Sequence, residues 1–322
     1  MNRFQNKTVL ITGGTSGMGL ATAHRLLDEG AYVAVTGRDE QRLREAAAGL
    51  AAPERVLTVR ADAADLGDLD RLTREITAWR GGLDAVFANA GVGVFKPSAE
   101  ITEADFDLAV DVNFKGVYFT VLKALPLLRD GGAIVLNASW TLHRGLAVAS
   151  VYSATKAAVH NLARTLAADL APRAIRVNSV SPGYIDTPMY RAANPDPAAE
   201  AATTAQIPLA TLGHPDEVAA AVAFLASDRR LVHHGPGPDH RRRPARLGPP
   251  DPLNVEGPRC KRIPGVAPNT LSQSSPDRSR GYGDVLTCDA VEVTVVYGHS
   301  AEKQSHVGAA RRPGVGYVGM TP

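Results

Sequence analysis

The sequence predicts an α/β protein with a doubly wound parallel sheet, followed by an irregular or disordered C-terminal tail. Two observations predict the sheet: short β-branched runs alternate with Ala- and Leu-rich amphipathic stretches, and the first such run ends in a Gly-rich turn. A third observation predicts the tail, because the alternation stops near Asp228. We therefore expect one folded domain over residues 1–228 and a separate tail over residues 229–322. Ligands of such sheets bind beyond the carboxyl ends of the strands, and the chemistry is expected there.

Each expected strand is a short run that is apolar enough to be covered on both faces. In chain order the runs are TVLIT from Thr8, YVAVT from Tyr32, RVLTVR from Arg55, DAVFA from Asp84, AIVLNA from Ala133 and IRVNSV from Ile175. The segments between them have the composition of amphipathic helices, as a parallel sheet requires.

Composition excludes several classes of protein. A net charge of +2 and 44% hydrophobic residues argue against a nucleic-acid or membrane-surface protein, although the basic run HRRRPARL from His240 could bind anions. No apolar run reaches the roughly 18 residues that cross a bilayer, and Met1 leads into a strand rather than a signal peptide, so we expect a cytoplasmic protein. Cys260 and Cys288 both follow Asp228, so neither thiol chemistry nor a metal site is expected in the folded part.

The Gly-rich turn TGGTSGMG runs from Thr12 to Gly19 and leads into a helix. Gly13 permits a tight turn, Gly17 lets the backbone approach a phosphate, and Gly19 allows close packing on the strand, with the pyrophosphate at the helix N-terminus. Thr15, Ser16 and Met18 belong to the same expected phosphate-binding turn. The spacing alone does not exclude a purely structural turn.

A second group of residues points to acid–base chemistry. YSATK places Tyr152 and Lys156 four residues apart on one helix face, and Ser139 closes the fifth strand. A nearby ammonium is expected to lower the pKa of the tyrosine, while the Ser139 hydroxyl polarises a carbonyl or alcohol oxygen. On its own, the Tyr–Lys pair is equally compatible with a surface helix.

Together these motifs resemble the short-chain dehydrogenase/reductases, whose fold is of the Rossmann type. The matching segments, in the order and spacing of that family over residues 1–228, are TGGTSGMG, NAG at Asn89, DVNFKG around Asn113, Ser139, YSATK and SPGYIDTPM from Ser181. The resemblance implies hydride transfer between a nicotinamide cofactor and a carbonyl or alcohol carbon, with Tyr152 as general acid/base. Residues 1–228 are accordingly expected to form a dinucleotide-binding and catalytic domain. The resemblance further implies a catalytic tetrad of Asn113, Ser139, Tyr152 and Lys156, in which Asn113 holds a water that links Lys156 to solvent. Without the resemblance, Asn113 would be interpreted as a structural Asn that kinks a helix.

The resemblance also implies which further residues bind the cofactor. Asp62 would contact the adenine, or would instead cap a helix within RADAAD. The others, besides the Gly-rich turn, Tyr152 and Lys156, are Asn89, Gly91, Pro182, Gly183 and Thr187.

The end of the second strand favours NADP(H), with NAD(H) as the alternative. An acidic residue at this tip would bind the ribose 2′-hydroxyl of NAD, but the place is held by Gly37. Arg38 follows and suits a phosphate contact, although Asp39 lies nearby and a loop-tip Arg is often solvated.

A small-molecule carbonyl or alcohol is the expected partner, with no nucleic acid or membrane. Its expected contacts follow Ser139 and the sixth strand: Trp140, His143, Arg144, Tyr184, Met189 and Tyr190. Arg144 could meet an anionic substrate, but equally Trp140 could pack in the interior and Arg144 be solvated. Two other functions stay open, a nucleotide-binding protein with little or no turnover because its C-terminal segment is lost, and nucleic-acid binding through HRRRPARL.

The tail is interpreted as translated out of frame. Residues 229–322 hold 12 of the 22 Pro, 12 of the 30 Gly and both Cys, with little periodicity apart from VEVTVVYG from Val291. After FLASD the family usually continues with a segment similar to ASSFTTGxxLTVDGGL, its last strand. Back-translated from Val232 and shifted by one base, the tail permits SFTTGxxLTIDGG in register. A frameshift would leave the strand at Ile175 without its edge partner and make a family-like homo-oligomer doubtful; the alternative is a genuine lineage-specific tail.

Overall fold

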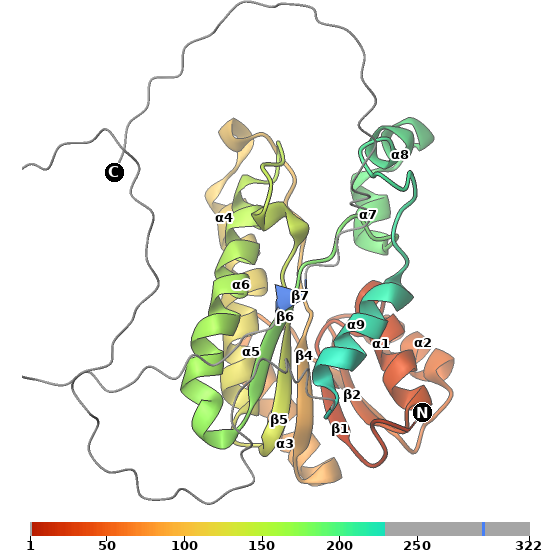
Figure 1. Ribbon diagram of the computed structural model, residues 1–322, viewed down its shortest axis with the longest axis vertical. Helices are drawn as coiled ribbons and strands as arrows, with labels where there is room; N and C mark the ends of the chain where they lie inside the picture. Colours follow the sequence, from red (N-terminus) through yellow and green to blue (C-terminus); the bar gives the residue numbers. More distant parts are fainter. Residues whose placement is uncertain (1, 229–291, 294–322) are drawn as a thin grey trace, which may run out of the picture. The chain divides into compact units, whose positions relative to one another are not determined.

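A parallel sheet forms the centre of the protein (Figure 1). The computed structural model describes residues 2–228 and 292–293. The strands follow the order β3-β2-β1-β4-β5-β6-β7, so the chain reverses its direction of travel across the sheet between β3 and β4. Their bounds are β1 Thr8–Ile11, β2 Tyr32–Gly37, β3 Val56–Arg60, β4 Leu83–Ala88, β5 Leu128–Asn137, β6 Arg176–Val180 and β7 Glu292–Val293. All six strands expected from the sequence are confirmed, and so is the doubly wound parallel sheet.

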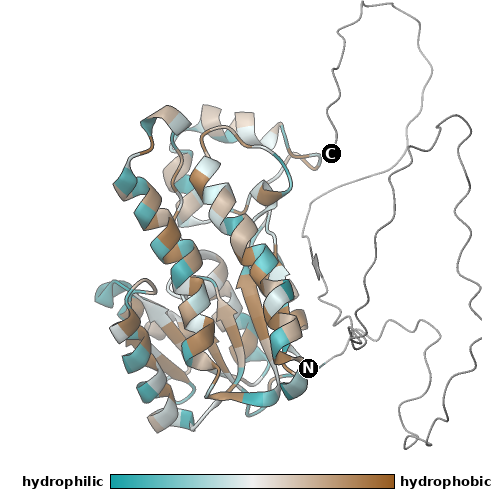
Figure 2. Cartoon of the chain, turned by 90° about the vertical axis from the view of Figure 1, so that its left-hand side faces the viewer, coloured by the Kyte–Doolittle hydropathy of each residue, from teal (hydrophilic) through white to brown (hydrophobic). Residues whose placement is uncertain are grey.

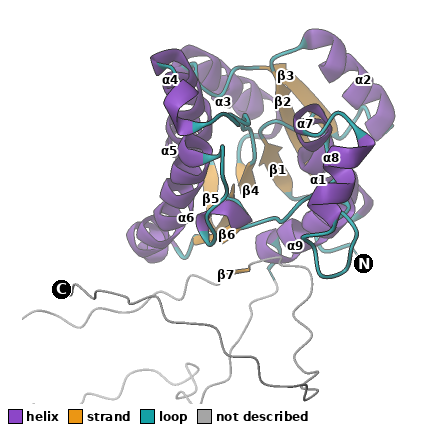
Figure 3. Cartoon of the chain, turned by 90° about the horizontal axis from the view of Figure 1, so that it is seen from above, coloured by secondary structure: helices purple, strands orange, loops and turns teal. Residues whose placement is uncertain are grey.

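Helices cover both faces of the sheet, as Figure 3 shows from above. Alternation along each strand explains why both faces are apolar: Val9 and Ile11 pack toward α1 and α9, whereas Leu10 packs toward α3, α5 and α6. The hydropathy colouring of Figure 2 shows brown strands behind helices that carry teal residues on their outer faces. The helix bounds are α1 Gly17–Asp28, α2 Glu40–Leu50, α3 Leu66–Arg80, α4 Glu103–Val110, α5 Gly116–Ala124, α6 Ser150–Leu170, α7 Pro188–Ala193, α8 Pro197–Thr204 and α9 Pro215–Ala226.

Side-chain caps begin most of these helices, and one absence bears on function. Asp39, Asp65 and Thr102 accept hydrogen bonds from backbone N–H groups in the first turns of α2, α3 and α4. Helix α1 follows Ser16, which makes no such bond, and its first turn contains no acidic residue. The amide groups that begin α1 are therefore left available to an anion.

The fifth strand differs from its expected bounds at both ends. It begins at Leu128 rather than Ala133, because the RDGG segment that resembles a turn lies within the strand, where the pairing with β4 shifts register. It ends at Asn137, so Ser139 begins the short 3₁₀ turn Trp140–Leu142 instead of closing the strand.

Most of the expected tail, residues 229–291 and 294–322, lies outside the described residues, including the basic run from His240 and both cysteines. Glu292 and Val293 are described, and they pair in parallel with Ser179 and Val180 of β6. The expectation that β6 loses its edge partner is therefore wrong over these two residue pairs. They belong to VEVTVVYG, the segment of the tail with strand-like alternation.

Candidate active site

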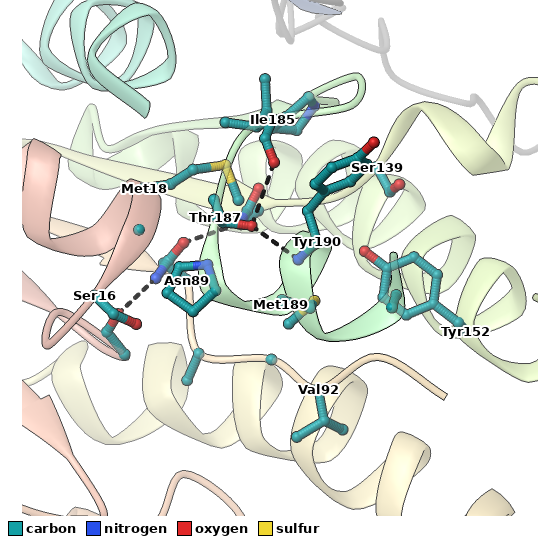
Figure 4. A pocket seen from close by; sticks show the side chains of 18 of the residues that line it. Ser16, Met18, Asn89, Val92, Ser139, Tyr152, Ile185, Thr187, Met189 and Tyr190 are labelled. Atoms are coloured by element: carbon teal, nitrogen blue, oxygen red, sulfur yellow. Dashed lines mark hydrogen bonds between the residues drawn. The ribbon is translucent and has the colours of Figure 1, made fainter. Parts of the chain in front are cut away.

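A cavity of about 880 Å³ lies at the carboxyl edge of the sheet. The segments that follow six strands contribute to its wall, at the position where doubly wound sheets bind ligands. One lining residue from each segment is, in chain order, Gly13, Arg38, Asp62, Asn89, Ser139 and Pro182. Figure 4 shows Ser16 and Met18 on one side of this cavity and Ser139 and Tyr152 on the other.

The Gly-rich turn has a geometry that other residues would disturb. Gly13 has a φ of +64°, and a Cβ on Gly19 would lie 2.3 Å from the Gly13 carbonyl oxygen. Gly19 does not line the cavity but packs beneath the turn, whereas Thr15, Ser16, Gly17 and Met18 line it. Because the first backbone N–H groups of α1 have no side-chain cap, they can donate hydrogen bonds to a phosphate group in this turn.

Asn89 braces that turn from the end of β4. Its amide nitrogen donates to the carbonyl oxygens of Thr12 at 3.1 Å and Gly13 at 3.0 Å, and its oxygen accepts from Asn137 at 2.9 Å. The side chain thus holds the shape of the cavity in addition to lining it. The Asn137 Oδ1 atom is buried without a hydrogen-bond partner among the described residues, although the residue itself lines the cavity.

The cavity end beside β2 and β3 carries its charged residues. The Arg38 side chain is 62% exposed, and its guanidinium lies 3.9 Å from the Asp62 carboxylate. The Asp39 carboxylate accepts from the Arg42 amide at 2.8 Å as the cap of α2, so it is engaged within its own helix. The alternative that Asp62 caps a helix is wrong, because Asp65 caps α3 while Asp62 accepts from the Ala64 amide in a short turn.

Tyr152, Ser139 and Lys156 meet at the other end. Tyr152 and Lys156 lie one turn apart on α6, and the Lys156 side chain is buried with its Nζ donating to the Asn137 carbonyl oxygen at 2.7 Å. Nζ also lies 5.8 Å from the centre of the Tyr152 ring. The Ser139 oxygen accepts from the Thr141 amide and hydroxyl at 3.3 and 3.1 Å, which fixes its position next to Tyr152.

Burial controls the protonation of this group. It raises the pKa of Tyr152, and a hydrogen bond with Ser139 opposes that rise. Burial also lowers the pKa of Lys156 to about 8. The expected lowering of the Tyr152 pKa is not met, because burial is the largest effect on that hydroxyl and the Lys156 Nζ is directed at the Asn137 carbonyl. The tyrosine hydroxyl therefore keeps its proton at neutral pH.

Asn113 makes structural contacts in this arrangement, and its expected part in the catalytic tetrad stays a prediction. It is fully buried in a π-helical turn, Asp111–Lys115, which joins α4 to α5. Its Oδ1 accepts from the Val92 amide at 2.7 Å, and its Nδ2 donates to the Val92 carbonyl at 2.9 Å and to Thr155 Oγ1 at 3.3 Å. The helix distortion expected for a structural Asn is confirmed, and its amide ties the loop after β4 to α6.

Comparison with known proteins identifies the family. The profile described as Enoyl-(Acyl carrier protein) reductase matches residues 13–235. Oxidoreductase asL5 of Sarocladium schorii is 41% identical over 229 residues, covering 70% of this chain and 91% of that protein. Levodione reductase of Leifsonia aquatica is 37% identical over 239 residues, covering 70% and 89%. The crystal structure of a short-chain dehydrogenase/reductase from Brucella melitensis superposes with a TM-score of 0.67 at 37% identity, covering 70% and 91%.

The chain belongs to the short-chain dehydrogenase/reductases. It is therefore an oxidoreductase, and the resemblance noted in its motifs is confirmed. A related structure from Burkholderia cenocepacia, 36% identical with a TM-score of 0.66 and covering 70% of this chain and 92% of that one, was solved in complex with NADP. Within the part of this dehydrogenase/reductase that the structure describes, no helix is both long enough and apolar enough to cross a membrane.

The expected substrate residues of this dehydrogenase/reductase divide into two groups. Trp140, Tyr184, Met189 and Tyr190 line the cavity, whereas His143 and Arg144 are exposed and do not. The reason is the 3₁₀ turn after Ser139, which buries Thr141 and carries the next residues outward. Trp140 also packs on Tyr184, with ring centres 4.9 Å apart. It therefore both packs against a neighbouring ring and lines the cavity.

Several lining residues were not found from the sequence. Arg42 adds a second cation beside Arg38, and its position four residues on in the helix that follows could have indicated it. Phe95 packs on Tyr152, with ring centres 5.2 Å apart, and Val148 lies beside it in the lining. No local pattern marks these two, because they stand in irregular loops that only the tertiary structure brings together.

Proposed function

We propose that this dehydrogenase/reductase is NADP(H)-dependent and transfers hydride between the nicotinamide and a carbonyl or secondary alcohol carbon, with Tyr152 as general acid/base. The observation that carries the proposal is the convergence of Tyr152, Ser139 and Lys156 in the cavity that the Gly-rich turn also lines. The nicotinamide supplies or accepts the hydride, and the side chains manage the proton and the oxygen.

In the reducing direction each side chain has a distinct task. Tyr152 keeps its proton at neutral pH and donates it to the carbonyl oxygen as the hydride reaches the carbon. Ser139 donates a hydrogen bond to the same oxygen and holds it in place. Lys156, when protonated, stabilises the phenolate that Tyr152 becomes, and Asn113 positions the loop opposite through its bonds to Val92.

Residues along the rest of the cavity are proposed to hold the cofactor. The turn from Gly13 to Gly19 binds the phosphates, with Thr15, Ser16, Gly17 and Met18 at the start of α1. Asp62 would contact the adenine, and Asn89 and Gly91 would line the cofactor. Pro182, Gly183 and Thr187 hold the nicotinamide end with Tyr152 and Lys156.

The NADP preference rests on Arg38 and Arg42, because both cations line the cavity end beside β2 and β3 and Gly37 holds the strand tip where an acidic residue would favour NAD. Arg38→Ala is expected to raise the NADPH Michaelis constant about tenfold, because a hydrogen bond to a charged group is worth roughly 1.5–3 kcal/mol and this site is exposed. The NADH constant serves as the internal control. An unchanged Michaelis constant for NADPH in the variant would contradict the proposed NADP preference.

The acid–base role is tested with Tyr152→Phe. Turnover of a panel of ketones, followed by NADPH absorbance, is expected to disappear while the NADPH dissociation constant, measured by fluorescence titration, stays within about twofold, since the variant removes only a hydroxyl. Turnover that persists in the variant contradicts the role of Tyr152. A wild-type chain that binds NADPH but turns over no carbonyl would favour the nucleotide-binding alternative.

We further propose that residues 1–228 form the catalytic domain, that residues 229–322 are translated out of frame, and that the protein is cytoplasmic. The frame proposal is supported by the in-register DGG ending in the shifted reading and by the change of composition after Asp228.

A further inference from the structure

The tip of β2 and the Gly-rich turn meet at Gly37 and Thr15. Both residues line the cavity, at the end where Arg38 and Arg42 supply the cations. A Cβ placed on Gly37 would lie 2.6 Å from Thr15 Cγ2 and 3.2 Å from Thr15 Oγ1. Non-bonded carbon atoms are separated by about 3.5–4.0 Å at their optimum. Any side chain at position 37 would therefore collide first with the Thr15 methyl group.

The backbone of Gly37 does not itself require a glycine. Gly37 is the last residue of β2, and its φ lies outside the left-handed region. Other residues adopt such a strand conformation without strain, and a glycine in a strand often marks a close approach by another segment. The neighbouring Thr15 therefore explains why a side chain does not fit here.

Backbone hydrogen bonds hold both partners of this contact. On the strand side, the Gly37 carbonyl accepts from the Ala61 amide at 3.0 Å, which fixes the tip of β2 to the segment after β3. On the turn side, the Gly14 amide donates to the Thr36 carbonyl at 3.0 Å, which ties the residue before Thr15 to the residue before Gly37. Threonine is also β-branched, so its χ1 angle is restricted. Neither segment can move away without breaking these bonds.

The contact lies at the position that distinguishes the two nicotinamide cofactors. Sheets of this type carry at the tip of β2 the acidic residue that binds the ribose 2′-hydroxyl of NAD. Such a residue needs space for its Cβ and its carboxylate, and the Thr15 methyl group occupies the first part of that space.

We propose that Thr15 is a specificity-determining residue, whose methyl group excludes an acidic side chain from the tip of β2 and so keeps the site selective for NADP(H) over NAD(H). This inference rests on the proposed NADP preference. Two features then select the cofactor: Arg38 and Arg42 attract a 2′-phosphate, and Thr15 excludes the carboxylate that would repel it. Gly37→Asp alone should therefore not convert the protein to NADH.

The test introduces aspartate at position 37 with and without the methyl group. Gly37→Asp is compared with the double variant Thr15→Ser, Gly37→Asp, because Thr15→Ser removes only Cγ2 and keeps the hydroxyl. The double variant Thr15→Val, Gly37→Asp is the matched control, since valine keeps a methyl group and lacks the hydroxyl. Dissociation constants for NADH and NADPH are measured on the full chain by fluorescence titration, so the result does not depend on the carbonyl substrate.

The expected constants differ between these variants. Gly37→Asp should bind NADPH about tenfold more weakly than the wild type, because a carboxylate beside the 2′-phosphate repels it, and should bind NADH no better than the wild type. The double variant with Thr15→Ser should bind NADH about tenfold more tightly than Gly37→Asp, because the overpacking is relieved and the carboxylate can accept from the ribose. The double variant with Thr15→Val should show no such gain.

A melting experiment tests the contact without any cofactor. Gly37→Ala adds only the Cβ, so it should lower the Tm by roughly 2–10 °C in the wild-type chain and by less than about 2 °C when Thr15→Ser is already present. Gly49→Ala is the control, because a Cβ there meets no atom within 4 Å, and it should not lower the Tm.

Three outcomes would overturn the inference. The first is NADH binding by Gly37→Asp that equals that of the double variant with Thr15→Ser, and the second is an equal gain in the double variant with Thr15→Val. The third is a Gly37→Ala chain that melts like the wild type, since position 37 then has room for a side chain. A Gly37→Asp chain that folds only together with Thr15→Ser supports the inference.

Failure of the proposed function gives a different result. A wild-type chain that binds NADH more tightly than NADPH contradicts the NADP preference itself, even where the melting comparison confirms that Thr15 excludes a side chain at position 37.

Discussion

Removing the Asn113 side chain is expected to lower both the stability and the activity of the protein. Asn113→Ala deletes two hydrogen bonds to the Val92 backbone, at 2.7 and 2.9 Å, and a weaker one to Thr155 at 3.3 Å. Each neutral bond contributes about 0.5–1.5 kcal/mol, and the fully buried amide leaves a small void. Val92 is partly exposed, so water can recover part of the loss. We expect a decrease of about 2–4 kcal/mol in the free energy of unfolding.

The assay is urea unfolding followed by circular dichroism, with a thermal melt beside it. In a domain of this size the loss corresponds to a fall in Tm of roughly 5–15 °C. Gln41→Ala is the control, because it also deletes an amide that makes a hydrogen bond, at 2.9 Å to Glu45, but on an exposed helix face. Its effect should stay within about 0.5 kcal/mol.

The same experiment separates two roles for Asn113. If the residue acts only by holding a water that links Lys156 to solvent, activity falls while the free energy of unfolding stays within about 0.5 kcal/mol of the wild type. That result would refute the reasoning from the Val92 contacts. A loss of stability that cofactor binding partly restores supports the structural role.

Three further predictions follow from the structure and the sequence. In a pH profile of kcat, ketone reduction should slow above about pH 8, because burial lowers the pKa of Lys156 to about 8 and the charged form that stabilises the phenolate is lost as pH rises. Lys156→Arg should have a lower kcat, but that kcat should not decrease above pH 8, because arginine keeps its charge. Gly19→Ala should abolish NADPH binding in a fluorescence titration, because its Cβ would lie 2.3 Å from the Gly13 oxygen, whereas Gly49→Ala, with no atom within 4 Å, should bind normally and gain about 0.5–1 kcal/mol of stability. Sequencing the gene across the Asp228 codon should show that inserting or deleting one base restores a frame that encodes the DGG ending. The restored chain should have a higher Tm and a higher rate of carbonyl reduction. If no one-base change yields that ending, the frameshift proposal is refuted.

The strands and the chemistry of the site were predictable because they depend on local patterns. Apolar runs such as the one from Thr8 indicate buried parallel strands, and the Tyr152–Lys156 spacing places both side chains on one helix face whatever the tertiary structure. The Gly-rich turn was predictable for the same reason, since its glycines are required by local backbone geometry.

The remainder depends on contacts between distant segments. The pairing of Leu83 with Leu128 draws the RDGG segment into β5, and no local pattern shows it. The Lys156 ammonium is directed by a carbonyl nineteen residues earlier in the chain. The expected lowering of the Tyr152 pKa was wrong because burial, which depends on the tertiary structure, raises it. Phe95 and Val148, which line the cavity beside Tyr152, likewise come from loops that the sheet brings together.

The most direct test of the central claim follows a deuterium label. The full chain is incubated with a ketone and NADPH that carries deuterium at both C4 positions, and the product is examined by mass spectrometry and NMR. Hydride transfer to a carbonyl, with proton donation by Tyr152, predicts an alcohol with one deuterium on the carbinol carbon and none transferred by Tyr152→Phe. Two results would contradict the account. In the first, an unsaturated ketone gives a product with deuterium on a carbon of the reduced C=C bond and with its carbonyl intact. In the second, the chain binds the labelled NADPH but forms no labelled product.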